Sequence, residues 1–234
     1  MKHCARYLLP FFGFIFIGRS FAAQSPEEAP SADSLLRVME QTYAAAKSYT
    51  DVSTATYRNR DGSERLSVTF LIWLARPASF RVDAESKGPA SQEARREVLW
   101  ADGAITRTWA SDKAVKSLPK VQIAKSGMFG TYAYHVPTLL EASYGARRLH
   151  ELTEPQLLSD EAFEGVDCQH VRGKWDGDIY EVWLGKADHL VRKILATYAD
   201  HTLEEVHREI IIDQPIPAEI FRFAPEQEVL PKKH

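Results

Sequence analysis

The stretch SVTFLIWLARPASFRV, residues 67–82, decides the fold that this sequence predicts. Residues 67–74 are rich in β-branched and aromatic side chains and contain no glycine or proline, a composition typical of a strand. Arg76 then precedes Pro77, and a residue before proline is disfavoured in the α region. A second short run, 79–82, follows at once. The proline therefore marks a bend between two adjacent strands of one sheet.

Runs with a period of two continue on both sides of this pair. Asp-Gly pairs at 61–62, 102–103 and 176–177 separate consecutive runs, and glycine accepts the positive φ that tight hairpin turns need. No strand-helix-strand crossover is recognisable, so we expect an antiparallel sheet. The predicted strands are 50–59, 64–74, 79–84, 96–100, 105–109, 166–174, 179–184, 190–198 and 204–212, with a last edge strand at 220–223.

Two helices are predicted beside the sheet. The first is capped by Asp33 or Ser34 and runs to about Lys47, because apolar residues recur there on one stripe. The second covers 136–144, with Pro137 in its first turn and Gly145 as C-cap. It belongs to an apolar, irregular region, 114–145, which is either an ordinary connection packed on the core or a movable lid.

The element inventory predicts a hollow. Nine or ten strands at ~4.8 Å spacing make a sheet roughly 45 Å wide, whereas two helices, each ~10 Å across, cover about half of one face. The sheet must therefore curl into an incomplete barrel or bury the remaining apolar face against a ligand or partner. We predict an α+β fold: a curved antiparallel sheet forming an incomplete β-barrel, capped by an N-terminal helix and a short central helical lid.

Residues 1–22 resemble a secretory signal peptide. Basic Lys2 and Arg6 precede an apolar run at 8–17 that is too short for a transmembrane span, and small residues follow it. An uncleaved N-terminal anchor is the alternative. We expect an exported, soluble protein with a flexible leader at 23–33, one domain at 34–226 and a charged tail at 227–234.

The charge argues against a nucleic-acid partner, and the cysteine content argues against a disulfide. Without residues 1–22 the chain has 26 basic and 32 acidic residues, so we expect no nucleic-acid partner. Cys168 is then the remaining cysteine, which excludes an intramolecular disulfide.

Three short motifs in a fixed order carry a family resemblance. They are Trp73-x-x-Arg76-Pro77-x-x-Phe80, then Asp102-Gly103, and finally Phe221-x-Phe223-x-Pro225. Together with the signal peptide, the N-terminal helix and the C-terminal strand succession, this order resembles the LolA-type periplasmic lipoprotein carriers and their uncharacterised relatives. The resemblance spans most of the chain after residue 22. The loop at 87–95 and the cover at 114–145 depart from the family pattern.

The resemblance implies a half-open barrel capped by helices, which binds acyl chains without being an enzyme. It further implies an acylated lipoprotein or a lipid as ligand, inner- and outer-membrane envelope proteins as possible partners, a monomer, and a periplasmic location. Arg76 matches the arginine that latches the helical lid in those carriers, and Phe80 matches the aromatic residue that matters for delivery. The same scaffold also occurs in sensors of lipoproteins, so an envelope sensor or interaction module is the alternative function.

Residues that could contact a ligand are apolar or aromatic members of the predicted strands and helices. Plain core packing is the competing interpretation for each of them, and an exposed strand-end arginine is the competing interpretation for Arg76. The predicted ligand-binding residues are Phe80, Phe70, Trp73, Trp100, Trp183, Leu35, Met39, Tyr43, Leu139 and Leu140.

Catalytic and metal-binding signals are weak. Cys168 and His170 lie two apart on a predicted strand and share a face, so they form either a nucleophile pair or a buried thiol beside a rim histidine. No third orienting residue is recognisable. His189, His201 and His207 lack the compact spacing of metal ligands. We therefore predict no catalytic residue, no metal and no cofactor.

Overall fold

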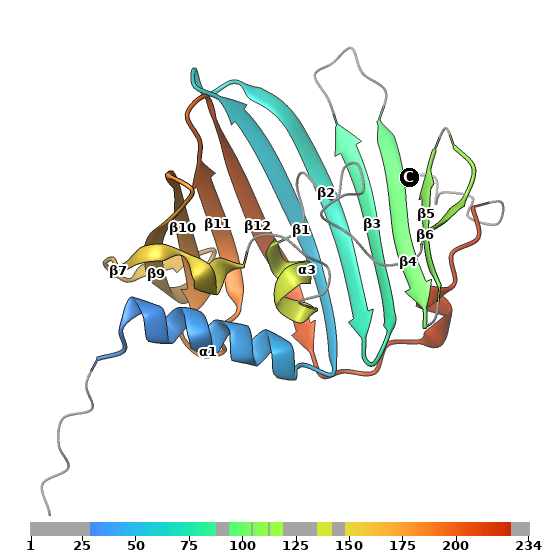
Figure 1. Ribbon diagram of the computed structural model, residues 1–234, viewed down its shortest axis with the longest axis horizontal. Coiled ribbons are helices and arrows are strands. Elements are labelled where there is room, and N and C mark those ends of the chain that lie inside the picture. Colours follow the sequence, from blue (N-terminus) through green and yellow to red (C-terminus); the bar gives the residue numbers. More distant parts are fainter. Residues whose placement is uncertain are drawn as a thin grey trace, which may run out of the picture.

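The computed structural model of the chain describes residues 29–87, 94–103, 105–111, 113–118, 135–141 and 148–225. Antiparallel strands dominate this part of the chain, and short helical segments lie beside them (Figure 1). The elements in chain order are α1 (Ala32–Ala45), β1 (Ser48–Asn59), β2 (Glu64–Ala75), β3 (Ser79–Lys87), β4 (Arg95–Asp102), β5 (Thr106–Ala110), β6 (Lys116–Leu118), α3 (His135–Leu140), the 3-10 helix η3 (Leu149–Glu151), β7 (Thr153–Leu157), β8 (Glu161–Phe163), β9 (Val166–Trp175), β10 (Asp178–Gly185), β11 (Val191–Thr197), β12 (His201–Ile212) and the 3-10 helix η4 (Ala218–Phe221).

The described strands form one 12-stranded antiparallel sheet. Its order is β6-β5-β4-β3-β2-β1-β12-β11-β10-β9-β7, and β8 pairs with β9 beside β7. The junction of the two halves is the pairing of β1 with β12, from Tyr49 opposite Ile212 to Asn59 opposite His201. In Figure 1 the half from β9 to β1 curls around α1 and α3, while β3 to β6 extend away from them. The predicted α+β fold with an unclosed, curved antiparallel sheet is confirmed.

The tight turns follow the sequence. Gly62 has φ of 83° in the turn between β1 and β2. Asp176 and Gly177, between β9 and β10, have φ of 48° and 90°, and a two-residue hairpin turn requires positive φ at both positions. The edge strands β6, β7 and β8 were not predicted. β7 contains Pro155, which cannot donate to a sheet ladder and is therefore tolerated only where a strand has a free side.

The C-terminal end is a correction to the sequence prediction. Residues 220–223 do not form an edge strand, because the chain turns into η4 after Pro217, with Ile220 N–H donating to the carbonyl of Pro217 (3.1 Å). The Arg81 guanidinium donates to the carbonyl of Ile220 (3.2 Å). The segment therefore lies on the sheet surface instead of adding to its edge.

The N-terminus of α1 is a second correction. Ser31, rather than Asp33 or Ser34, is the N-cap: its hydroxyl accepts the N–H of Ser34 (3.1 Å). Asp33 lies in the first turn, where it pairs with Arg37 one turn later (2.9 Å). The helix ends at Ala45, two residues before the predicted end at Lys47.

The second predicted helix begins one residue early. α3 starts at His135, with Pro137 in its first turn as expected. It ends at Leu140, four residues before the predicted end at Tyr144, because Glu141 is no longer helical. Several predictions lie outside the described residues: the signal peptide 1–22, most of the leader 23–33, the charged tail 227–234, the Gly145 cap, and most of the 87–95 loop and the 114–145 cover.

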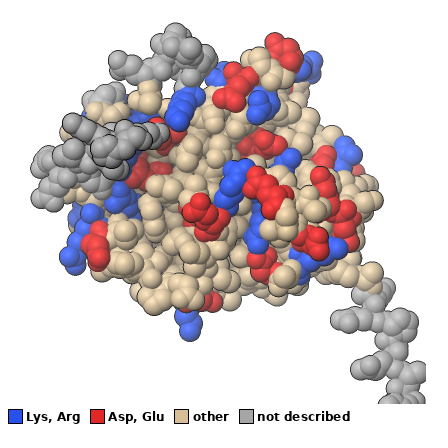
Figure 2. Space-filling model, turned by 180° about the vertical axis from the view of Figure 1, so that it is seen from behind, with Lys and Arg blue, Asp and Glu red and all other residues tan. Residues whose placement is uncertain are grey.

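The main core lies between the helices and the concave face of the sheet. Leu35, Leu36, Met39 and Tyr43 of α1 are buried in it against inward-facing strand residues. The described residues contain no helix that is long and apolar enough to cross a membrane. On the face shown in Figure 2, acidic and basic side chains lie next to one another, and ion pairs such as Lys186–Asp160 (2.6 Å) join described segments.

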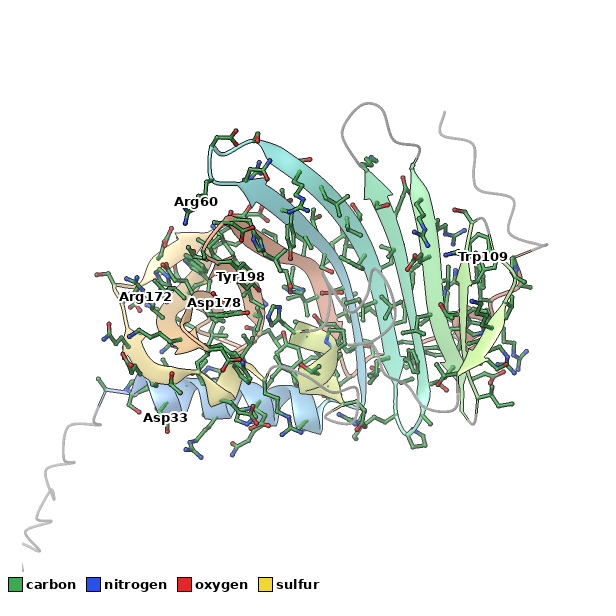
Figure 3. All side chains as sticks on the ribbon, turned by 45° about the horizontal axis from the view of Figure 1, so that its top comes forward. Asp33, Arg60, Trp109, Arg172, Asp178 and Tyr198 are labelled. Atoms are coloured by element: carbon green, nitrogen blue, oxygen red, sulfur yellow. The ribbon has the colours of Figure 1, made fainter. Side chains whose placement is uncertain are left out.

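A second, smaller core lies on the outer face of the sheet extension. The Phe223 ring contacts Trp100 and Trp109, with centroids 4.9 Å and 5.3 Å apart, and the Arg81 guanidinium lies 5.0 Å above it. Figure 3 shows Trp109 at the opposite end of the molecule from Asp33 on α1. The outer core is therefore separate from the helices, and it anchors the chain after η4.

Phe223→Ala should destabilise the protein by about 3 kcal/mol, because the substitution removes a buried ring from a packed aromatic cluster. Ile211→Ala is the control, since Ile211 is half exposed on β12 and its truncation should cost less than about 0.5 kcal/mol. Urea unfolding monitored by tryptophan fluorescence measures both values. Equal losses in the two variants would contradict the anchoring role of Phe223.

Candidate functional site

The concave face beneath α1 and α3 brings together seven of the ten predicted ligand-binding residues. α1 contributes three of them, α3 two, and strands β2 and β3 one each. All seven are buried in the same apolar core, which makes this face the candidate site. They are Leu35, Met39, Tyr43, Leu139, Leu140, Phe70 and Phe80.

The three predicted tryptophans lie on the outer face instead. Trp73 lies between two core residues of β2, so its side chain points to the opposite face from theirs. On that face it contacts Arg81 of the neighbouring strand β3, whose guanidinium lies 5.6 Å from the ring centroid. Trp100 packs on Phe223 in the outer core. Trp183 stacks on His170 with centroids 4.0 Å apart. Strand alternation separates these residues from the candidate site.

Arg76 ties the ends of both helices to the sheet. Its Nε donates to the carbonyl of Ala46, the C-cap of α1 (2.8 Å), and its Nη2 donates to the carbonyl of Leu140, the last residue of α3 (2.5 Å). Nη1 lies 3.8 Å from the Glu141 carboxylate. Carbonyls at helix C-termini have no partner within the helix, so a guanidinium with five donors suits this position.

A buried polar chain crosses the middle of the same face. His135 Nδ1, at the start of α3, lies 2.7 Å from Glu205 Oε1 on β12. His207, two residues further along β12, contacts Glu205 with Nε2 (3.8 Å) and Asp51 of β1 with Nδ1 (2.7 Å). The Tyr49 hydroxyl donates to the same Asp51 oxygen (3.0 Å). α3 is therefore held by polar contacts at both of its described ends.

Mutual compensation keeps Glu205 and His207 charged. Burial alone would raise the pKa of the Glu205 carboxyl, but the interactions with His135 and His207 bring it down to about 2. Burial alone would lower the pKa of His207, but the hydrogen bond to Asp51 and the nearby negative charges of Asp51 and Glu205 raise it to about 9. The chain consists of ionic contacts inside an apolar core, where removal of one partner is costly.

A small cavity lies beside this polar chain. It has a volume of about 10 Å³ and is bordered by Pro137 of α3, Phe70 of β2, and Glu205 and His207 of β12. That volume suits one water molecule.

Cys168 and His170 do not form a reactive pair. Cys168 is fully buried, and its burial raises the pKa of the thiol, which disfavours the thiolate that a nucleophile needs. His170 Nε2 is 2.9 Å from the Glu181 carboxylate, and its ring is covered by Trp183. Within the described ranges, no three His, Cys, Asp or Glu side chains gather as a metal site.

Sequence reasoning missed the polar chain. His207 was considered only as a metal ligand, and Asp51, His135 and Glu205 were not singled out. The alternation of side chains along β12 could have pointed to two of them. Glu205 and His207 are two residues apart, so they face the same side of a strand whose neighbouring positions are buried. Their pairing with Asp51 depends on β1 and β12 being neighbours, which the sequence does not state.

The comparison with solved structures shows the fold. LprF from Mycobacterium bovis matches with a TM-score of 0.51 at 10% identity, over 80% of this chain and 95% of LprF. A DUF1329 family protein from Desulfovibrio piger matches with a TM-score of 0.39 at 12% identity, over 82% and 95% of the two chains. LolA superfamily protein NE2245 from Nitrosomonas europaea matches with a TM-score of 0.39 at 11% identity, over 83% and 99%.

The TM-score of the LprF match supports the same overall architecture, whereas the TM-scores of the other two matches are too low to do so. No protein-family model matches the sequence, and no curated protein matches it either. The match to LprF supports the predicted fold, a curved, unclosed antiparallel sheet covered by helices.

The buried polar chain predicts a stability maximum in mildly acidic solution. Glu205 has a folded pKa of about 2 against an ordinary 4.5, so its contribution is present above pH 4.5 and is lost as the pH falls towards 2. His207 has a folded pKa of about 9 against 6.5, so its contribution is complete below pH 6.5 and is lost as the pH rises through 9. Each contribution amounts to about 3 kcal/mol at most.

Urea unfolding at pH 6 and pH 9.5 measures the alkaline half of this prediction. The difference in free energy of unfolding between the parent and His207→Gln should shrink by about 2–3 kcal/mol between these pH values. A difference that stays constant with pH would show that His207 is not charged in the folded protein.

Proposed function

We propose that this protein is a non-enzymatic, soluble periplasmic carrier that binds the acyl chains of a lipoprotein or lipid beneath α1 and α3. The LolA-like fold and the signal-like pattern of residues 1–22 support the location and the general class of ligand. Phe70, Phe80 and the apolar residues of the two helices provide the surface that would contact the chain. Opening of α3 would give access to it.

The contact of Arg76 with the C-terminal carbonyls of α1 and α3 carries this proposal. One side chain bonds to the C-terminal ends of both covering elements, so its release would loosen both ends together. The contact is also only partly shielded, because roughly a third of the Arg76 side chain is exposed to solvent. A partly hydrated contact of this kind can break and re-form at modest cost.

The energetics fit a carrier that hands over its ligand. Burial of one long acyl chain is worth roughly 12 kcal/mol at ~0.8 kcal/mol for each CH₂, before binding costs are subtracted. Breaking the Arg76 contacts and separating α3 from the sheet uses part of this free energy. The closed form of the empty protein thereby weakens ligand binding and favours release.

Arg76→Leu should increase affinity for an acylated molecule and slow its release, because the closed form loses its contacts to both helix ends. Hydrogen bonds to a charged group are each worth ~1.5–3 kcal/mol when they are buried. Because Arg76 is partly exposed, we expect its two bonds together to be worth about 1.4 kcal/mol, which is a tenfold gain in affinity. Fluorescence titration with a dye-labelled palmitoyl peptide measures affinity, and stopped-flow transfer to phospholipid vesicles measures release.

Arg107→Leu is the matched control. Arg107 is a partly exposed arginine on β5 that pairs with Asp102 (3.2 Å), remote from both helices. Its substitution should change neither affinity nor release. If Arg76→Leu loaded and released the peptide as the parent does, the latch would be ruled out. If neither the parent nor the variant bound the peptide, the sensor or interaction module on the same scaffold would be favoured.

A further inference from the structure

The polar chain beneath α3 lies where an acyl ligand would be bound. Glu205 is almost completely buried, and its carboxylate has His135 of the covering helix as one partner and His207 of its own strand as the other. The nearby strand residues Phe70 and Ile72 are apolar. A purely apolar carrier interior has no need of such groups, so the ligand has to accommodate them.

Displacement of α3 changes the environment of Glu205. His135 moves away with the helix, and the shortest ionic contact of the carboxylate, 2.7 Å, is lost. The contact that remains is with His207 Nε2 at 3.8 Å. A hydrocarbon chain in the place of α3 would exclude water from the carboxylate without replacing its hydrogen-bond donor, which is costly for a buried charge.

The remaining groups define what the ligand should offer. Asp51 and Glu205 are two carboxylates against the one imidazolium of His207, so a ligand anion is repelled. Within the described ranges, His207 Nε2 has no hydrogen-bond partner although it is buried. After α3 leaves, Glu205 Oε1 therefore lacks the donor that His135 provided. His207 Nε2, which lies 3.8 Å from the other Glu205 oxygen, still has no acceptor within hydrogen-bond distance among the residues that the structure describes. The two groups lie on the same face of one strand.

We propose that this interior selects acyl amides, with the amide N–H donating to Glu205 in the place of His135 and the amide carbonyl accepting from His207 Nε2. The inference rests on the carrier function proposed above and names its ligand class. Esters lack the N–H and leave Glu205 without a donor. Free fatty acids bring a third carboxylate to the site. The polar chain thus acts as a specificity filter inside an apolar site.

Two probes that differ only in the N–H test the proposal. N-dodecylacetamide and dodecyl acetate have the same chain and carbonyl, and dodecanoate supplies the anion. Their affinities are measured at pH 7 by displacement of the fluorescent probe N-phenyl-1-naphthylamine, below the concentration at which the amphiphiles aggregate. The parent protein should bind the amide about tenfold more tightly than the ester, and dodecanoate more weakly than either.

Glu205→Met removes the acceptor with little change of side-chain volume and should bring the amide and the ester to equal affinity. Glu204→Met is the matched control: Glu204 is the next residue on β12, faces the other side and pairs with Lys193 (3.0 Å), so the preference should persist. The comparison of the three amphiphiles on the parent protein decides the proposal even if Glu205→Met does not fold.

The outcomes separate the inference from the function on which it rests. Equal binding of amide and ester by the parent would overturn the filter and leave the carrier function intact. A preference for the amide that persists in folded Glu205→Met would overturn the role of Glu205. If neither the fluorescent probe nor any amphiphile bound, the carrier function would fail, and the filter with it.

Discussion

An antiparallel sheet that curls without closing has a concave apolar face, and that face has to be covered by something other than itself. Here α1 and α3 cover it, and the C-terminal ends of both helices have to be held against the sheet. The Arg76 guanidinium provides the restraint by bonding to the carbonyls of Ala46 and Leu140. Because the bonds run to backbone carbonyls, they fix the positions of the helix ends rather than particular side chains. The organisation of the site depends on this one junction.

The junction does not act alone on α3. At the other end of the described helix, His135 contacts the carboxylate of Glu205, which His207 and Asp51 support in turn. The two attachments differ physically. The Arg76 contacts lie near the surface, where water can replace them, whereas the His135 contact is buried, where nothing replaces it except a ligand group. In the proposed carrier, the Arg76 end of α3 would govern opening and the His135 end would govern ligand choice.

The sheet separates two functions between its faces. The inner face carries the residues of the candidate site, while the outer face carries Trp73, Trp100 and Trp183 in contacts with cations and other rings. Aromatic residues are often taken as signs of a ligand site, but here the largest of them stabilise the scaffold. The outer cluster around Phe223 also anchors the C-terminal segment, so this segment packs on the outer face and not on the inner one.

The sequence by itself determined nine of the twelve described strands, the Asp-Gly turns and the amphipathic face of α1, because these follow from the local periodicity of side chains and from the freedom of glycine. It also indicated Arg76, through the proline that follows it. Only the tertiary structure decided which aromatic residues face inward, how the chain ends after Pro217, and that Asp51, His135, Glu205 and His207 meet. The physical reason is that their contacts join residues 70 to 156 positions apart, and such pairings depend on which strands become neighbours rather than on local pattern.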